Sequence, residues 1–329
     1  MIKFWITNAR YNALPQSMLP AIVAIAYALP AAGFSWGYAL MALLGTAMAH
    51  LSLNLFDDYF DYRSKGTAIR EKLSAGSIRV RLGKCHYLTS GKATLKQLLS
   101  VAVLFGVIAL LLGFFIFLKR GNVILYIVLI TMLTGLSYSA PPLKLSYIGL
   151  GELTIAMVFG PLLMSGVHYA ASGLLSAEIW FISVSVGLLV ANIVYTHAIM
   201  DYEHDKCARK MTFAVLLHNR TAMLAVSALF MLMACLVIVA GAFTGFLSWW
   251  YLLTIITLPV SATLFYQLAV FVKHPEKEFR PRWWMQPMEH WQQIEAAGIG
   301  WFMGRWFLSR NLAVWFCFIL IIISLIIKY

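Results

Sequence analysis

The chain has 329 residues, of which 61% are hydrophobic and only 12% are charged. Soluble globular domains normally carry about 25% charged residues, so the composition argues against a soluble fold. The net charge of +12 would suit a nucleic-acid partner. The placement of the basic residues along the chain indicates membrane topology instead, and we therefore expect no nucleic acid to bind.

Uncharged runs of membrane-spanning length, about 20 residues each, recur along the chain. In chain order they are 11–56 (two spans, with a break at 29–37), 97–118, 121–143, 153–177, 179–200, 221–272 (two spans, with a break near 241–250) and 311–327. The pattern predicts an all-α, polytopic membrane protein whose nine transmembrane helices form one bundle.

The basic residues are concentrated on one side of these spans. With the N-terminus inside, alternate loops hold 22 of the 25 Lys and Arg residues, and only Lys119, Arg120 and Lys328 fall on the other side. Cytoplasmic loops of membrane proteins carry such an excess. We therefore expect a multi-pass protein of a plasma membrane with its N-terminus and most basic loops in the cytoplasm.

The acidic residues gather at two corresponding helix ends. Asp57, Asp58 and Asp61 close the second span, and Asp201 and Asp205 close the sixth. Residues three or four apart lie on one face of a helix, so each group brings carboxylates together. We therefore expect two four-helix halves plus a ninth helix, with a site between the halves.

We expect one transmembrane domain, 1–329, that consists of these two halves and a C-terminal part. The first half covers about 5–140 and the second about 141–272. The segment 273–310 is rich in Trp and Arg, which favours a cytoplasmic loop lying in the membrane interface. A last helix, 311–327, follows it.

Close carboxylates near a membrane repel one another and need a positive partner. Mg²⁺ prefers carboxylate oxygens and keeps positions open for phosphate. Basic residues in the same loops indicate an anionic substrate, so two acidic helix ends with nearby Lys and Arg predict a diphosphate site. The plainer alternative is that these acids are solvated loop charges.

Three ordered motifs carry a resemblance to a known family. The stretches "NLFDDYFDYRSKG" (54–66) and "YTHAIMDYEHDKCARKMTFAV" (195–215) resemble the two aspartate-rich motifs of UbiA-type intramembrane prenyltransferases. Between them, "YSAPPLKLSYIGLGELTIAMVFGPLLMSG" (138–166) is similar to the central signature of the 1,4-dihydroxy-2-naphthoate prenyltransferases of menaquinone synthesis.

The resemblance implies an Mg²⁺-dependent enzyme of a prokaryotic membrane, with a central cavity that opens near the cytoplasmic face. It would transfer an isoprenyl group from an isoprenyl diphosphate to an aromatic acceptor within the lipid bilayer. In the naphthoate branch the acceptor loses its carboxylate and gives demethylmenaquinone. The resemblance specifies neither the prenyl length nor the oligomeric state.

Site residues are carried over one by one. Asn54, Asp58 and Asp61 match the first motif, and Asp201 and Asp205 match the second. The resemblance implies that these four aspartates are catalytic and bind the metal. Asp57 is an additional metal ligand, and Asn54 contacts substrate.

Further substrate-binding candidates are polar residues near the same helix ends. Each has a plainer alternative. The lysines and arginines could simply belong to the excess of basic residues in cytoplasmic loops, and the glutamate could be a favourable charge at a helix N-terminus. The other side chains could serve packing or hydrogen bonding between helices. The candidates are Lys144, Arg79, Arg81, Lys84, Glu152, Tyr138, Asn192 and His197.

Three positions depart from the family pattern. Asp57 stands where many members have Asn, and His197 where the naphthoate branch commonly has Asn. Arg209 replaces the usual Gly of a "GKxT" stretch, which here reads "RKMT". The first two affect the expected metal and acceptor contacts, and the third affects the expected loop geometry.

Two functional alternatives remain open. One keeps the chemistry and changes the acceptor to hydroxybenzoate, homogentisate, a glycerol-phosphate lipid or haem. The other is a membrane transporter, which intramembrane acids and duplicated halves would also fit. The transporter is disfavoured because both acidic motifs lie at one membrane face.

Overall fold

The computed structural model describes residues 2–64, 85–275 and 277–327, and this part of the chain is almost entirely helical. Seven of its helical segments are long and apolar enough to cross a membrane. They are α3 (Trp36–Ser64), α7 (Leu95–Arg120), α9 to α10 (Gly151–Met157 and Leu163–Ser172, joined by a π-helical turn, Val158–Leu162), α11 (Ala177–Met200), α14 (Arg220–Phe243), α15 (Leu258–Lys273, preceded by the 3₁₀ segment Trp249–Thr257) and α17 (Gly300–Ile327).

Two shorter helices lie among these long ones. They are α2 (Pro15–Ala28) and α8 (Asn122–Ser137), with 14 and 16 residues. The expected breaks at 29–37 and near 241–250 are present, because α2 ends before α3 and α14 ends before the segment that leads into α15. The all-α class and the membrane-spanning character are confirmed, whereas the count of nine spans stays a prediction.

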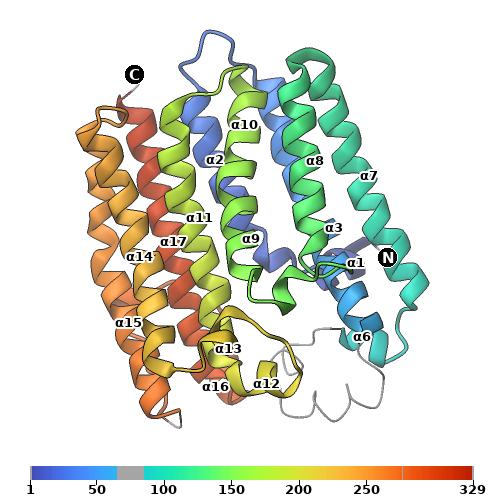
Figure 1. The fold of residues 1–329 in the computed structure, drawn as a ribbon, viewed down its shortest axis with the longest axis vertical. Helices are drawn as coiled ribbons and strands as arrows, with labels where there is room; N and C mark the ends of the chain where they lie inside the picture. The colour runs from blue at the N-terminus through green and yellow to red at the C-terminus, as the bar shows by residue number, and fades with distance from the viewer. Residues whose placement is uncertain (1, 65–84, 276, 328–329) are drawn as a thin grey trace.

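The long helices run side by side as one bundle (Figure 1). Neighbours in the chain pack on one another from α2 to α17, and α17 returns to pack against α2 and α11. Short helices gather at the lower end of the bundle in Figure 1, where α3 and α11 end, and we call this end the acidic end. They are α6 (His86–Thr89), α12 (Tyr202–Cys207), α13 (Phe213–Leu217) and α16 (Trp291–Ala296), with α1 (Ile2–Asn8) nearby.

Local sequence signals explain where the helices begin and end. Thr94 and Gln97 form a reciprocal capping box at the start of α7, which satisfies two backbone N–H groups that lack helical partners. Gly121, with φ of 81°, separates α7 from α8. Gly173, with φ of 78°, ends α10 in the left-handed conformation that glycine adopts readily.

The last helix begins earlier than expected, at Gly300 rather than at residue 311. Hydropathy placed Arg305 outside the span because an arginine in a membrane helix is costly. In the structure Arg305 is fully buried. Its Nε donates to the Gln267 carbonyl at 2.9 Å, and its guanidinium lies 5.2 Å from the ring centre of Phe271. Carbonyl and aromatic partners therefore accommodate the cation inside the bundle.

The segment before α17 was also expected to lie only in the interface, over 273–310. Its side chains Phe279, Met285 and Met288 are buried in the same apolar core as α11 and α17. The Asn311 side chain fixes this segment, since its Nδ2 donates to the carbonyls of Met285 and Pro287, both at 2.9 Å. The segment therefore forms part of the bundle's packing.

Two glycines allow α11 to cross the α9–α10 segment at backbone contact. A Cβ atom on Gly187 would lie 2.3 Å from the Ala156 carbonyl oxygen, and one on Gly160 would lie 2.4 Å from the Ser183 carbonyl oxygen. The contact coincides with the π-helical turn that contains Pro161. Small residues at such crossings allow close helix packing in membranes.

This contact gives the first prediction. Gly187→Val should destabilise the protein by at least about 3 kcal/mol, because the added atoms meet backbone that cannot rotate away. Gly37→Val is the matched control, since a Cβ there meets only the Ser35 hydroxyl at 3.7 Å. Thermal unfolding in detergent measures both, and equal melting temperatures for the two variants would contradict the assignment.

Candidate active site

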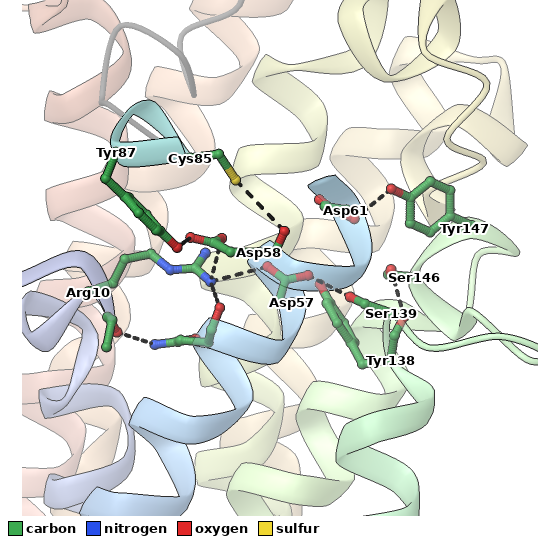
Figure 2. A network of polar contacts seen from close by, with 12 residues as sticks. Arg10, Asp57, Asp58, Asp61, Cys85, Tyr87, Tyr138, Ser139, Ser146 and Tyr147 are labelled. Atoms are coloured by element: carbon green, nitrogen blue, oxygen red, sulfur yellow. Dashed lines mark hydrogen bonds and ion pairs between the residues drawn. The ribbon is translucent and has the colours of Figure 1, made fainter. Parts of the chain in front are cut away.

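The first acidic group lies in the last two turns of α3 and shares one cation. The Arg10 Nη2 atom lies 3.2 Å from Asp57 Oδ2 and 3.3 Å from Asp58 Oδ1 (Figure 2). Burial of Arg10 would lower the pKa of its guanidinium, but the charges of Asp58 and Asp57 outweigh burial and raise it above its ordinary value. Arg10 therefore stays charged and offsets the repulsion between the two carboxylates.

Asn54 holds Arg10 in place. Its Nδ2 donates to the Ala9 carbonyl at 3.0 Å, and its own carbonyl accepts from Arg10 Nη2 at 2.8 Å. The pair of bonds fastens the N-terminal segment across α3. The structure thus gives Asn54, a predicted substrate contact, a position from which it orients the cation at the first acidic group.

Hydroxyl groups from three other parts of the chain complete the first group (Figure 2). Tyr87 Oη donates to Asp58 Oδ2 at 3.1 Å, Ser139 Oγ to Asp57 Oδ1 at 2.5 Å and Tyr147 Oη to Asp61 Oδ1 at 2.6 Å. Burial and the charge of Asp58 raise the pKa of Tyr87, which keeps this phenol protonated as a donor. Each carboxylate is thus fixed by at least one charge-assisted hydrogen bond.

The second acidic group lies where α11 gives way to α12. Asp201 is the residue between the two helices, and Asp205 donates its backbone N–H to the Asp201 carbonyl at 2.9 Å. Both side chains are buried. Asp205 Oδ2 is enclosed and accepts no hydrogen bond from the described part of the chain. A buried carboxylate oxygen of this kind favours a cation as its partner.

Tyr147 lies between the first acidic group and the lysine that follows the second. While its hydroxyl donates to Asp61, its ring centre lies 5.8 Å from Lys144 Nζ and 5.5 Å from Lys210 Nζ. Lys210 follows the second acidic group in the chain and is buried. Two lysines from separate loops of the second half therefore lie near one ring beside Asp61.

The loops that carry these lysines are joined directly. Ile148 and Met211 form an isolated parallel bridge. The buried Glu152 carboxylate accepts a hydrogen bond from the Phe213 N–H and lies within electrostatic range of Lys210 and Asp205. Glu152 therefore sits between the two loops, close to the second acidic group.

The other predicted site residues fall in three places. Tyr138 follows α8 and lies beside the first group, where its carbonyl accepts from Ser146 Oγ at 2.7 Å. Asn192 is fully buried in the core, and its Oδ1 accepts from Ser227 Oγ at 2.9 Å. This is a hydrogen bond between helices, the plainer of the two alternatives for Asn192. The His197 ring lies 5.2 Å from that of Phe302 on α17. Arg79, Arg81 and Lys84 lie outside the described residues.

Several residues of this site were not predicted from the sequence. Lys210 carried one signal, because it stands in the "RKMT" stretch next to the second motif. The remaining residues had no local signal, since their partners lie far away in the chain. They are Arg10, Tyr87, Ser139 and Tyr147.

An apolar cavity of about 340 Å³ adjoins the first acidic group. It lies between α3, α7, α8 and the α9–α10 segment and reaches Phe56, the residue before Asp57. Its far end is lined by Ile116, Ile124 and Ala170. The volume falls within the range of small-molecule sites, roughly 300–1,000 Å³.

No group of three or more His, Cys, Asp or Glu side chains within residues 2–64, 85–275 and 277–327 is arranged to hold a metal ion by itself. The acids instead form two separate groups. Mg²⁺ is commonly bound by one or two carboxylates together with waters and substrate phosphates. The donor set therefore fits a metal that is completed by a phosphate ligand.

The structure thus combines a bundle of helices long enough to span a membrane, two acidic helix ends with nearby lysines, and an apolar cavity whose lining reaches the first acidic group's neighbour Phe56. Residues 17–291 match the UbiA prenyltransferase family, and the chain belongs to this family. It is therefore a prenyltransferase, a transferase of the class expected from the motifs.

The chain is also similar to particular proteins of named activity or known structure. The chain is 25% identical over 250 residues to the 1,4-dihydroxy-2-naphthoate octaprenyltransferase of Bacillus subtilis, covering 76% of this chain and 77% of the relative. It is 26% identical over 307 residues to the 2-carboxy-1,4-naphthoquinone phytyltransferase of Synechocystis, covering 91% and 94%. A UbiA homolog from Archaeoglobus fulgidus, solved with GPP and Mg²⁺, has the same fold, with a TM-score of 0.59, 14% identity and coverage of 96% and 99%.

Arg209 gives the second prediction. Its φ of 52° lies in the left-handed region, which a glycine at the usual family position adopts without strain. Arg209→Gly should leave stability and activity close to wild type, whereas Arg209→Val should lower stability by roughly 1–2 kcal/mol because a β-branched residue is strained there. Thermal unfolding and turnover distinguish them, and a fully active, equally stable Arg209→Val protein would contradict this assignment.

Proposed function

We propose that the protein catalyses Mg²⁺-dependent transfer of an isoprenyl group from an isoprenyl diphosphate to 1,4-dihydroxy-2-naphthoate, with loss of CO₂, to give demethylmenaquinol, the reduced form of demethylmenaquinone. The observation that carries the proposal is the juxtaposition at the acidic end of Asp61, Lys144 and Lys210 around Tyr147, near an apolar cavity whose lining reaches Phe56 on the same helix as Asp61. The diphosphate of the donor would thus bind at the acidic end, and its apolar isoprenyl tail would bind in the neighbouring cavity.

The diphosphate would lie between the two acidic groups. Asp57, Asp58 and Asp61 on one side and Asp201 and Asp205 on the other would hold Mg²⁺. Bound there, Mg²⁺ would neutralise charge on the departing diphosphate. The solved homolog with GPP and Mg²⁺ supports this assignment.

The basic residues would also neutralise charge on the diphosphate or orient the groups that do so. Lys144 and Lys210 would neutralise phosphate oxygens that the metal does not reach. Arg10 would keep Asp57 and Asp58 oriented, because its guanidinium bonds both carboxylates. Tyr147 would position Asp61 through its hydroxyl.

The transfer breaks the bond between C1 of the isoprenyl group and the diphosphate oxygen, and the electron pair leaves with the diphosphate. The ring carbon that carries the carboxylate then bonds to C1 of the allylic cation, and CO₂ leaves from that carbon, so that the C–CO₂ bonding pair restores the aromatic quinol. Water would compete for the cation. The aliphatic and aromatic lining of the cavity beside the site, including Leu53 and Phe56, would keep water away.

The choice of naphthoate rests on the relatives. The two named above act on naphthoate or naphthoquinone acceptors, as their names state, and the 138–166 stretch resembles that branch. The same reading favours a prokaryotic plasma membrane, and the excess of Lys and Arg on one side favours an active site facing the cytoplasm.

The test is turnover by the purified protein with Mg²⁺, 1,4-dihydroxy-2-naphthoate and isoprenyl diphosphates. Mass spectrometry should find a product that has gained the isoprenyl group and lost CO₂. Asp61→Asn and Asp201→Asn should each lower kcat at least ~10²-fold, because each removes a charge that opposes the leaving group. Both variants should unfold at the wild-type temperature within a few degrees.

Glu278→Gln is the matched control, since this carboxylate is 80% exposed and lies away from the site. It should retain wild-type turnover. Full activity in EDTA or in both aspartate variants would contradict the metal-diphosphate assignment. A product that gains the isoprenyl group and keeps the carboxylate, or that forms only from another acceptor, would contradict the naphthoate assignment.

A further inference from the structure

The apolar cavity ends in packed side chains at the end opposite the acidic groups. At the acidic end its lining reaches Phe56, beside Asp57. At the opposite end, Ile116, Ile124 and Ala170 form a packed cluster with Ala42 and neighbouring aromatic residues. The cavity therefore has a floor made of side chains from α3, α7, α8 and α10.

Arg120 ties this floor together from outside. Its Nη2 donates to the carbonyls of Gly33 and Ala171, both at 2.8 Å, and its Nε donates to Ala170 at 3.0 Å. Tyr169 Oη donates to the Arg120 carbonyl at 2.9 Å. The end of α7 is thereby fastened to the end of α10 and to the α2–α3 connection. Arg120, one of three basic residues placed on the far side by the sequence, has a structural task there.

The depth of the cavity follows from α3, which lines it over most of its length. Ala42 at the floor lies 14 residues before Phe56, where the lining reaches the acidic end, and a rise of about 1.5 Å per residue gives roughly 21 Å. An isoprene unit adds four carbon–carbon bonds of about 1.5 Å and extends about 5 Å. The space between the acidic group and the floor therefore matches about four units.

We infer that the cavity floor limits the donor, so that the protein uses an isoprenyl diphosphate of about four isoprene units in preference to one of eight. This inference rests on the proposed function and adds the length of the donor to it. Ala42, Ile116 and Ile124 are then specificity-determining residues, because the end of the tail meets them.

Donor competition tests the inference directly. The purified protein is given geranyl, geranylgeranyl and octaprenyl diphosphates (two, four and eight units), and kcat/KM is measured for each. The four-unit donor should exceed the eight-unit donor by at least tenfold. Equal kcat/KM for these two donors would mean that the tail leaves sideways between helices, and would overturn the inference.

Two blocking variants measure the depth. Ala42→Phe fills the floor and should lower kcat/KM for the four-unit donor at least tenfold while the two-unit donor keeps more than half of its value. Ala49→Phe lies seven residues nearer the acidic group and should impair the four-unit donor still more. Should Ala42→Phe fail to fold, Thr46→Phe one turn away applies the same block.

Leu40→Phe is the matched control, because Leu40 lies on α3, is 57% exposed and does not line the cavity. Its donor preference should equal that of wild type. A blocking variant that leaves all donors unchanged, or impairs all equally, would overturn the length limit while the proposed function stands. Absence of turnover with every donor in the wild-type protein would overturn the proposed function and the inference with it.

Discussion

The structure of the acidic end depends on the repulsion between carboxylates at the end of α3. Asp57 and Asp58 are adjacent, and Asp58 is buried, so their charges need compensation that water does not supply. Arg10 provides it from a segment that precedes the first long helix. The N-terminus must therefore cross α3, and Asn54 holds it there. Three hydroxyl donors then bring α6, the end of α8 and the 145–147 turn to the same carboxylates.

Contacts to the carboxylates of the first acidic group also join the two halves of the chain. Tyr147 bonds Asp61 of the first acidic group, and its ring is flanked by Lys144 and Lys210. The bridge between Ile148 and Met211 keeps the two loops in register. The carboxylates of the two acidic groups and the lysines beside them thus lie at one end of the bundle, and the apolar cavity extends away from them. An amphipathic substrate is matched by this separation, because its charged and apolar parts need opposite environments.

Among the described residues, hydropathy predicted the seven helices that are long and apolar enough to cross a membrane, whereas the helices in the first span and in the run 121–143 have only 14 and 16 residues. It misplaced the start of α17, because Arg305 is accommodated by carbonyl and aromatic groups of distant segments. The acidic groups were recognisable because their carboxylates repeat at helical spacing. Arg10, Ser139 and Tyr147 were not, since their partners lie 47 to 86 residues away. Such contacts depend on the packing of whole helices, which local patterns do not encode.

The central claim is that acids, metal and diphosphate form one site, and binding without turnover tests it most directly. Geranylgeranyl thiolodiphosphate, whose sulfur resists ionisation, is titrated calorimetrically into the purified protein with Mg²⁺ or with EDTA. The account predicts that removing Mg²⁺ weakens binding at least tenfold, by about 1.4 kcal/mol, and that Mg²⁺ no longer strengthens binding to a protein carrying both Asp61→Asn and Asp201→Asn. Equal affinity with Mg²⁺ and with EDTA in the wild-type protein would contradict it.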